Sequence, residues 1–309
     1  MSDLDENISL AETEAEGLRR HFRRGGFAND SFWGALHDVS QLAVMTASFL
    51  ILGRKLGVDD YGRYVGLYGI VGPVGGLTWS GVTLAVLHRR LHDEHPPEDV
   101  AREFFGITIG LAVVAVLVGT ITGSLIISGL PVATIAAIMT AELFANALTA
   151  VSTSMVQAEK GFAPATRLRM VVLGIRLTVL LSLTVTGALS IRSLGIGFTV
   201  GFLVYLVVLL AKILPGHGIP FVLGGPRRGT APKIFQTSLP IAVGVLQQDG
   251  DKAVLNAYGY TAVAGLYGAA FRVVSMGLMP LRALEGAAFQ RFLPHDESAR
   301  NQHVRRAAR

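Results

Sequence analysis

Uninterrupted apolar runs recur along this chain. Four clear ones are 105–128, 132–151, 171–189 and 194–210. A helix needs about 20 apolar residues to cross a hydrocarbon core of roughly 30 Å. Lipid offers no partner to backbone N–H and C=O groups, so a single spanning segment must satisfy its own, which a helix does. The sequence therefore predicts an all-α, polytopic membrane protein.

The composition agrees with that prediction. Charged residues make up 16% of the chain and hydrophobic residues 51%, whereas soluble domains carry about 25% charged residues. The net charge of +5 lies mostly in short segments between the apolar runs, so it does not indicate nucleic-acid binding. The absence of cysteine excludes disulfides, thiolate nucleophiles and cysteine-based metal sites. With no catalytic triad, phosphate loop or zinc motif either, we expect no enzyme activity, no cofactor and no metal.

Eight spanning helices are predicted. Their approximate ranges are 32–53, 64–87, 104–128, 132–157, 167–188, 193–213, 234–257 and 261–286. Lysine and arginine favour cytoplasmic loops. Nineteen of these residues flank one side of the predicted bundle, and four flank the other: Arg54, Lys55, Arg63 and Arg192. We therefore predict that both termini are cytoplasmic and that the protein is a multi-pass protein of the inner (plasma) membrane.

The longest connection between predicted helices is rich in glycine and proline, at 214–233. This composition is typical of a flexible linker or a surface loop. It separates the first six helices from the last two, which predicts a boundary between two bundles.

Two short segments echo one another across that boundary. They are LGVDDYGRY at 56–64 and YGYTAVAGLY at 258–267. Each places a turn glycine (Gly57, Gly259) five or six residues before a second glycine (Gly62, Gly265). Transporters are often built from repeated halves.

Two longer stretches carry a resemblance to a known family. They are LGRKLGVDDYGRYVGLYGIVGPV at 52–74 and, more specifically, SLPIAVGVLQQDGDKAVLNAYGYTAVAGLYGAAFRVVSMGLMPLRAL at 238–284. The second stretch has an aspartate late in a helix, Asp251, then a short glycine turn and AGLYGAAFR. In these blocks the chain resembles the polysaccharide-biosynthesis flippases of the multidrug/oligosaccharidyl-lipid/polysaccharide exporter superfamily.

The resemblance implies two six-helix lobes that face each other across a cavity and move undecaprenyl-diphosphate-linked glycans from the inner to the outer leaflet. Eight helices supply the first lobe and only the opening pair of the second. We therefore expect a C-terminally shortened member, either a fragment or a protein that needs a partner. The expected segments are a polar cytoplasmic segment at 1–31, a six-helix lobe at 32–213, a cytoplasmic linker at 214–233, two helices of an incomplete second lobe at 234–290 and a basic cytoplasmic tail at 291–309.

Arg272 is the strongest candidate for ligand binding. At about 1.5 Å per residue, it lies roughly 16 Å into the last predicted helix. A charged residue at the centre of a spanning helix costs about 2.5–3.5 kcal/mol on insertion scales, so it indicates a partner or a function. Arginine binds phosphate oxygens in a bidentate fashion. We predict that Arg272 faces the cavity and binds a diphosphate; the alternative is a buried pair with an acidic residue of the preceding helix.

The predicted helix at 234–257 contains a polar stretch, QQDGDK. Its members are Gln247, Gln248, Asp249, Gly250, Asp251 and Lys252. Asp249 and Lys252 stand three residues apart, a spacing that allows an ion pair on one helix face. Gly250 would permit a kink beside a polar cavity, as in the broken helices of transporters. The alternative is that this stretch is the water-facing end of the helix.

Further polar candidates come from three other helices. Glu142 and Arg176 have similar predicted depth on antiparallel neighbours, which predicts an ion pair; Arg176 reaching the cytoplasmic surface and Glu142 coupling protons are the alternatives. Asp38 either faces the cavity, with a possible coupling role, or lies at the wet inner end of the first helix.

Glycine and aromatic residues add structural predictions. The glycines of 69–76 together with Pro73 predict a kink in the second helix. Gly197 and Gly201 form a GxxxG face for close helix packing. Trp33 and the tyrosines near helix ends fit interfacial anchors.

Taken together, these residues and the resemblance predict a flippase for undecaprenyl-diphosphate-linked oligosaccharide that works by alternating access. Its partners would be the lipid-linked glycan, membrane lipids and polysaccharide polymerase or assembly proteins. The alternatives are a cation-coupled multidrug exporter, which would favour acidic and aromatic cavity residues, and a membrane scaffold of a glycan assembly complex. The deep arginines, Arg176 and Arg272, favour an anionic substrate.

Overall fold

The computed structural model describes residues 24–91, 95–225, 227 and 229–292. These residues form helices joined by short connections, with no strand among them, so the predicted all-α class is confirmed. Almost all side chains of the predicted polar segment 1–31, and all side chains of the basic tail 291–309, lie outside the described residues; in the tail only the backbone of 291–292 is described.

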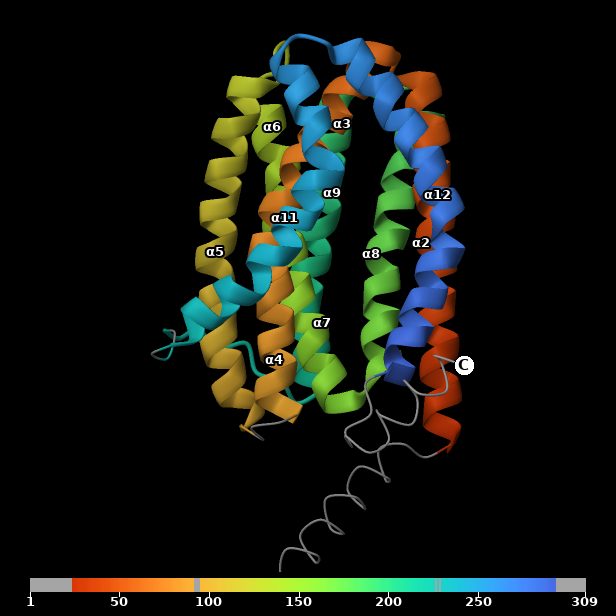
Figure 1. Ribbon diagram of the computed structural model, residues 1–309. Coiled ribbons are helices and arrows are strands. Elements are labelled where there is room, and N and C mark those ends of the chain that lie inside the picture. The colour runs from red at the N-terminus through yellow and green to blue at the C-terminus, as the bar shows by residue number, and fades with distance from the viewer. Residues whose placement is uncertain (1–23, 92–94, 226, 228, 293–309) are drawn as a thin grey trace, which may run out of the picture.

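The described helices form one elongated bundle (Figure 1). In chain order, with η marking π-helical turns, they are α2 (Arg24–Lys55), α3 (Val58–Gly75), η1 (Gly76–Ser80), α4 (Gly81–Leu91), α5 (Pro97–Ile126), α6 (Val132–Met139), η2 (Thr140–Ala145), α7 (Asn146–Lys160), α8 (Phe162–Val185), α9 (Ile191–Val208), η3 (Leu209–Ile213), α10 (Leu214–Gly216), α11 (Thr230–Ala257) and α12 (Thr261–Phe292). The beginning of α2 and the end of α12 lie at the same end of the bundle.

Six helical segments of the described chain are long and apolar enough to cross a membrane. They are Phe32–Lys55, Val58–Arg90, Pro97–Ile126, Val132–Lys160, Phe162–Val185 and Ile191–Gly216. In α12 only a shorter apolar stretch, Thr261–Ser275, stands out. The polytopic membrane class is therefore confirmed, while the count of eight spans and the orientation of the termini stay predictions.

The two turn glycines of the sequence echo explain where α3 and α12 begin. Gly57 and Gly259 have φ angles of 78° and 79°, in the left-handed region that glycine adopts without a steric penalty. The acidic residues Asp59 and Asp60 then occupy the first turn of α3, where the helix dipole favours negative charge. The predicted turns are thus confirmed.

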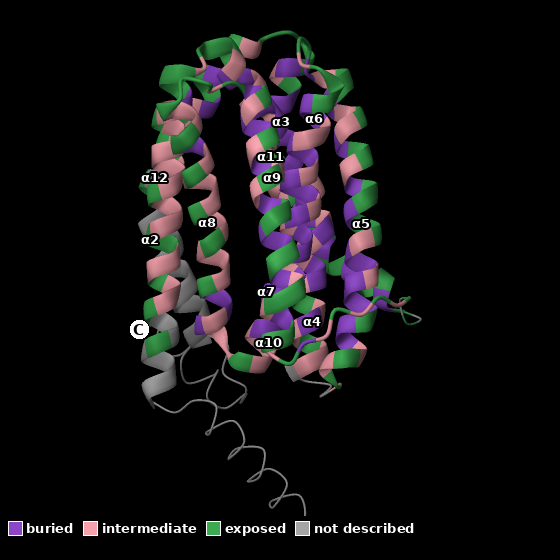
Figure 2. Ribbon diagram, turned by 180° about the vertical axis from the view of Figure 1, so that it is seen from behind, coloured by how far each residue is buried: buried purple, intermediate pink, exposed green. Residues whose placement is uncertain are grey.

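Burial is distributed unevenly over the bundle (Figure 2). In an apolar 18-residue stretch of the candidate span in α6–α7, 61% of the residues are buried, against 6% in the corresponding stretch of α2 and 11% in that of α8. A hydrophobic cluster joins α4, α5, α7 and α9 around Phe104, Phe105 and Leu209. α2 packs mainly against α8, whereas α8 also packs against α7 and α9.

The last two helices pack directly on α3. A Cβ added to Gly62 would lie 1.9 Å from the carbonyl oxygen of Thr261, and one added to Gly69 would lie 2.7 Å from the carbonyl oxygen of Asp249. Gly62 and Gly265, the second glycines of the echo, also meet: a Cβ on Gly265 would lie 3.2 Å from the Gly62 nitrogen. Only glycine permits such backbone approach, so α3, α11 and α12 form one closely packed unit.

Three helix predictions can be compared with the structure. The second helix leaves α geometry at η1, after Pro73 and the glycines around it, while the kink predicted there stays a prediction. By contrast, α11 is α-helical without interruption from Thr230 to Ala257, so the helix is not broken at Gly250, and the predicted kink there stays a prediction. Gly197 and Gly201 of α9 pack closely on Val179 and Ile175 of α8, as the GxxxG spacing predicted.

The connection before α11 is shorter than predicted and is held in place. It extends from the end of α10 at Gly216 to the start of α11 at Thr230. The buried carboxylate of Glu103, on α5, accepts hydrogen bonds from the Thr230 hydroxyl at 2.5 Å and the Arg227 N–H at 3.2 Å. Composition predicted a flexible linker or surface loop, but these contacts tie the described part of the loop to α5.

Candidate functional site

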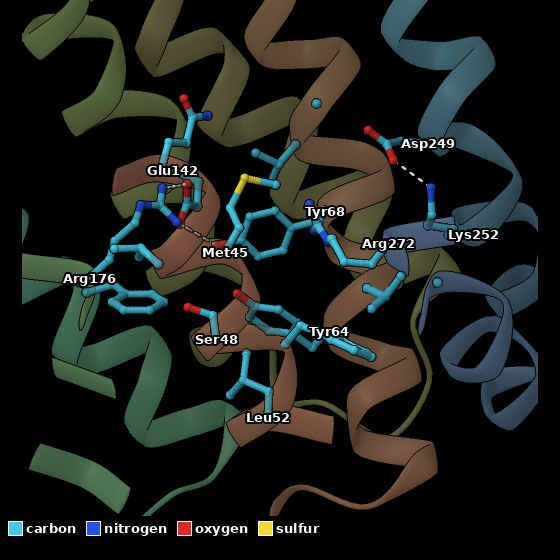
Figure 3. A pocket seen from close by; sticks show the side chains of 18 of the residues that line it. Met45, Ser48, Leu52, Tyr64, Tyr68, Glu142, Arg176, Asp249, Lys252 and Arg272 are labelled. Carbon is cyan, nitrogen blue, oxygen red and sulfur yellow. Dashed lines mark hydrogen bonds and ion pairs between the residues drawn. The ribbon is translucent and has the colours of Figure 1, made fainter. Parts of the chain in front are cut away.

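A cavity of about 460 Å³ opens between α2, α3, α8, α11 and α12, with η2 at one wall (Figure 3). Its volume falls within the roughly 300–1,000 Å³ that is usual for ligand sites. The polar and aromatic side chains that line it are Gln41, Ser48, Phe49, Tyr61, Tyr64, Tyr68, Trp79, Glu142, Asn146, Arg176, Phe198, Gln248, Asp249, Lys252, Phe271 and Arg272. Such a mixture can hold a ligand that combines a charged group with polar and apolar parts.

Glu142 is the centre of the network on one wall. Its side chain is 3% exposed and forms an ion pair with Arg176. The carboxylate also accepts hydrogen bonds from the Tyr68 hydroxyl at 2.5 Å and from the Asn146 amide at 3.0 Å. Arg176 donates to the Tyr68 hydroxyl at 3.2 Å and lies over the rings of Phe198 and Phe202. The charge of each partner is thus compensated before any ligand binds.

The backbone at Glu142 is unusual. The residue lies in η2, a π-helical turn between α6 and α7. π-Helical turns are rare and are often found at functional sites. Here the turn presents a carboxylate to the cavity from a segment that is otherwise apolar.

Lys252 and Asp249 form the charged pair of the opposite wall. The Lys252 ammonium is 2.5 Å from an Asp249 carboxylate oxygen and donates to the Gln248 carbonyl at 2.9 Å. It also lies 4.1 Å from the centre of the Phe271 ring, a cation–π distance. The spacing-based prediction of an Asp249–Lys252 pair is confirmed.

Arg272 differs from the other two cavity cations. It projects from α12 into the cavity beside Tyr64 and Tyr68 (Figure 3). Among the side chains that the structure describes, no carboxylate forms an ion pair with it. Both carboxylates of the cavity are paired elsewhere, so the alternative of a structural pair with α11 finds no support in this part of the chain. The cavity carries one net positive charge, and Arg272 is the group available to an anion.

Three tyrosines form a row along α3. Tyr61, Tyr64 and Tyr68 stand at helical spacing, with ring centroids 6.5 Å and 4.7 Å apart along the row. Residues at i, i+3 and i+7 share one helix face, and here that face is the cavity wall. Tyr61 and Tyr64, near the start of α3, were predicted only as interfacial anchors. Their repeated spacing is the signal that could have identified the row.

The structure brings together most of the residues predicted for the site. Those that line the cavity are Arg176, Arg272, Glu142, Gln248, Asp249 and Lys252. Three others do not. Gln247 is exposed on the outer face of α11, Asp251 lies outside the cavity at 3.7 Å from the Lys252 ammonium, and the Asp38 side chain is 76% exposed beside His37.

Helix geometry explains which members of the polar stretch reach the cavity. Because α11 is unbroken there, successive side chains point about 100° apart. Gln248, Asp249 and Lys252 share the inner face, whereas Gln247 and Asp251 share the outer one. No metal-binding group of His, Cys, Asp and Glu side chains occurs among the described residues.

Comparison with known proteins adds no further assignment. The chain matches no family model, no curated protein and no solved structure at a significant level.

Proposed function

We propose that this protein is a flippase that moves an undecaprenyl-diphosphate-linked oligosaccharide across the inner membrane by alternating access. The observation that carries the proposal is Arg272, an arginine without an acidic partner among the described side chains, in a cavity between membrane helices. An unpaired charge is costly at membrane depth. A diphosphate supplies the missing negative charge and matches the arginine fork.

A second, smaller pocket supports a lipid-linked substrate. It has a volume of about 290 Å³ and lies between α2, α3 and α12. Its lining is mainly apolar and includes Leu50, Val58 and Leu266. Phe49 and Tyr61 line both this pocket and the cavity, so an isoprenoid chain in the apolar pocket would adjoin a head group in the cavity.

The alternative of a cation-coupled multidrug exporter has weaker support. A cationic drug needs an available carboxylate, but Glu142 and Asp249 are each paired with a basic side chain. Binding a cation there would require breaking one of these pairs, and it would add positive charge beside Arg272. The scaffold alternative leaves the cavity itself unexplained.

The test is a deletion strain complemented with wild type, Arg272→Ala or Arg192→Ala. Arg192 is exposed, lies outside the cavity and serves as the matched control. Wild type and Arg192→Ala should relieve accumulation of the undecaprenyl-linked unit on the cytoplasmic face. Arg272→Ala should lower translocation about tenfold or more, since hydrogen bonds to charged groups contribute about 1.5–3 kcal/mol.

Two results would contradict the proposal. The first is a deletion strain with normal surface glycan and no accumulated lipid-linked unit, which removes the flippase function. The second is full activity of Arg272→Ala at wild-type expression, which removes the diphosphate role of this arginine.

A further inference from the structure

The tyrosine row of α3 has the chemistry of a carbohydrate subsite. We propose that Tyr64, flanked by Tyr61 and Tyr68, stacks against the first sugar attached to the diphosphate while Arg272 binds the diphosphate itself. This inference rests on the proposed function and adds to it the part of the glycan that the cavity recognises.

The first argument is the shape and charge of the ring surface. An aromatic ring carries partial negative charge on its face. A pyranose ring presents C–H bonds, with partial positive charge, on the face that lacks its hydroxyls. Tyr64 is half-buried and lines the cavity, and its ring lies 4.7 Å from that of Tyr68. The Tyr64 and Tyr68 rings are tilted by 45° and form no continuous plane, so the sugar would stack on the ring of Tyr64 itself.

The second argument concerns the neutral polar groups near the row. Ser48 of α2 and Tyr64 both line the cavity and are drawn near one another in Figure 3. Gln41, about two helical turns before Ser48 on α2, also lines the cavity. Neither side chain forms a hydrogen bond within the described part of the chain. A hydroxyl and an amide donate and accept hydrogen bonds, which suits the hydroxyls at the rim of a sugar that is stacked on Tyr64.

The third argument is the order of sites along the cavity. Tyr61 borders the apolar pocket, and Tyr68 is hydrogen-bonded to Glu142 at the other end of the row. Arg272 lies beside Tyr64 and Tyr68. Along the row, the apolar pocket adjoins Tyr61, and the next ring is Tyr64 with Arg272 beside it, so a diphosphate bound by Arg272 would hold its sugar next to Tyr64. A cavity of about 460 Å³ suits this proximal part of the molecule, and a long glycan would extend beyond it.

The experiment compares two soluble probes on detergent-purified protein by isothermal titration calorimetry. One is farnesyl diphosphate esterified to N-acetylglucosamine, and the other is farnesyl diphosphate esterified to a methyl group. Both carry the same diphosphate diester and isoprenoid, so the ratio of their dissociation constants reports the sugar alone. Wild type should bind the sugar probe about fivefold more tightly, the size of one aromatic stacking contact.

Variants assign that preference to Tyr64. Tyr64→Phe keeps the ring and should keep the preference. Tyr64→Leu should abolish it while leaving the affinity for the methyl probe within about twofold of wild type, a value that also shows the variant is folded. Tyr258→Leu is the matched control, because Tyr258 is 77% exposed and outside the cavity. Arg272→Ala should weaken both probes.

The outcomes separate the two proposals. If wild type binds both probes equally, or Tyr64→Leu keeps the preference, the sugar subsite is wrong and the diphosphate site stands. If wild type binds neither probe, the proposed function fails as well.

A third probe tests the stacking without any variant. Farnesyl diphosphate esterified to glucitol has the hydroxyls of a sugar but no ring face. Wild type should bind it more weakly than the sugar probe, and binding equal to that of the sugar probe would overturn the stacking role.

Discussion

Arg176 and Glu142 compensate each other's charge inside the bundle. The Glu142 side chain is almost fully buried, and it also accepts hydrogen bonds from Tyr68 and Asn146. Removing one member of a buried ion pair leaves the other charge without compensation, which costs about 3–5 kcal/mol. The pair therefore stabilises this wall of the cavity and holds the Tyr68 hydroxyl in place through its hydrogen bond to Glu142.

We expect Arg176→Met to lower the thermal unfolding temperature of the purified protein markedly. Adding Glu142→Gln in the same protein should recover part of the loss, because the amide removes the stranded charge and still accepts a hydrogen bond from Tyr68. Thermal unfolding of the two single variants and the double variant measures the coupling. Strictly additive losses would show that the two side chains do not interact as described.

Depth along a helix was sufficient to predict some side-chain contacts and insufficient for others. Three-residue spacing paired Asp249 with Lys252, depth on neighbouring helices paired Glu142 with Arg176, and both pairs are present. The sequence could not show that Gln247 lies outside the cavity, because a predicted kink at Gly250 left open which side chains of this stretch point into the cavity. The tyrosine row was missed since tyrosine near a helix end is also typical of a membrane interface.

The π-helical turns could not be predicted from apolar periodicity. Glu142 lies in η2, where the α-helical hydrogen-bond pattern is interrupted. An inserted residue shifts the facing of all side chains that follow it, so a regular 3.6-residue pattern loses its phase. Only the irregularity after Pro73 had a visible signal, because proline removes a backbone donor.

The contact between α3 and its two neighbours depends on glycine. We predict that Gly62→Ala destabilises the protein by about 1–3 kcal/mol, the usual cost of overpacking, because its Cβ would lie 1.9 Å from the Thr261 carbonyl oxygen. Gly244→Ala on α11 is the matched control, since a Cβ there meets nothing within 4 Å. It should be neutral or slightly stabilising, given alanine's higher helix propensity. Both can be compared by thermal unfolding in detergent, and equal stability of the two variants would contradict the close approach.

The number of spans is a property of the entire chain and can be tested by cysteine labelling. The natural sequence has no cysteine, so single cysteines can be introduced without background. We choose Ala188→Cys, Gly225→Cys and Tyr258→Cys, all at exposed positions in connections between helices. With eight spans and cytoplasmic termini, a membrane-impermeant maleimide should label positions 188 and 258 in intact cells, but position 225 only after lysis.

Each alternative topology gives its own labelling pattern. Protection of position 258 together with labelling of 188 would show that α11 and α12 do not cross the membrane. Labelling of position 225 in intact cells would show that the orientation is the reverse of the predicted one.

The sequence predicted the polytopic bundle well because apolar length is a local property. The docking of α11 and α12 on α3, by contrast, depends on contacts between residues about 190 apart in the chain.

The close packing of α3 with α11 and α12 also limits how the cavity can change the side to which it opens. Sliding these three helices past one another would force backbone atoms that are already in contact to collide, so they are expected to move as a rigid body. The helices α2 and α8 bury few residues and line the opposite side of the cavity. Of the two, α2 makes few contacts with α3 and α12, and the joint between α2 and the rigid body is therefore where the protein can bend at the lowest energy.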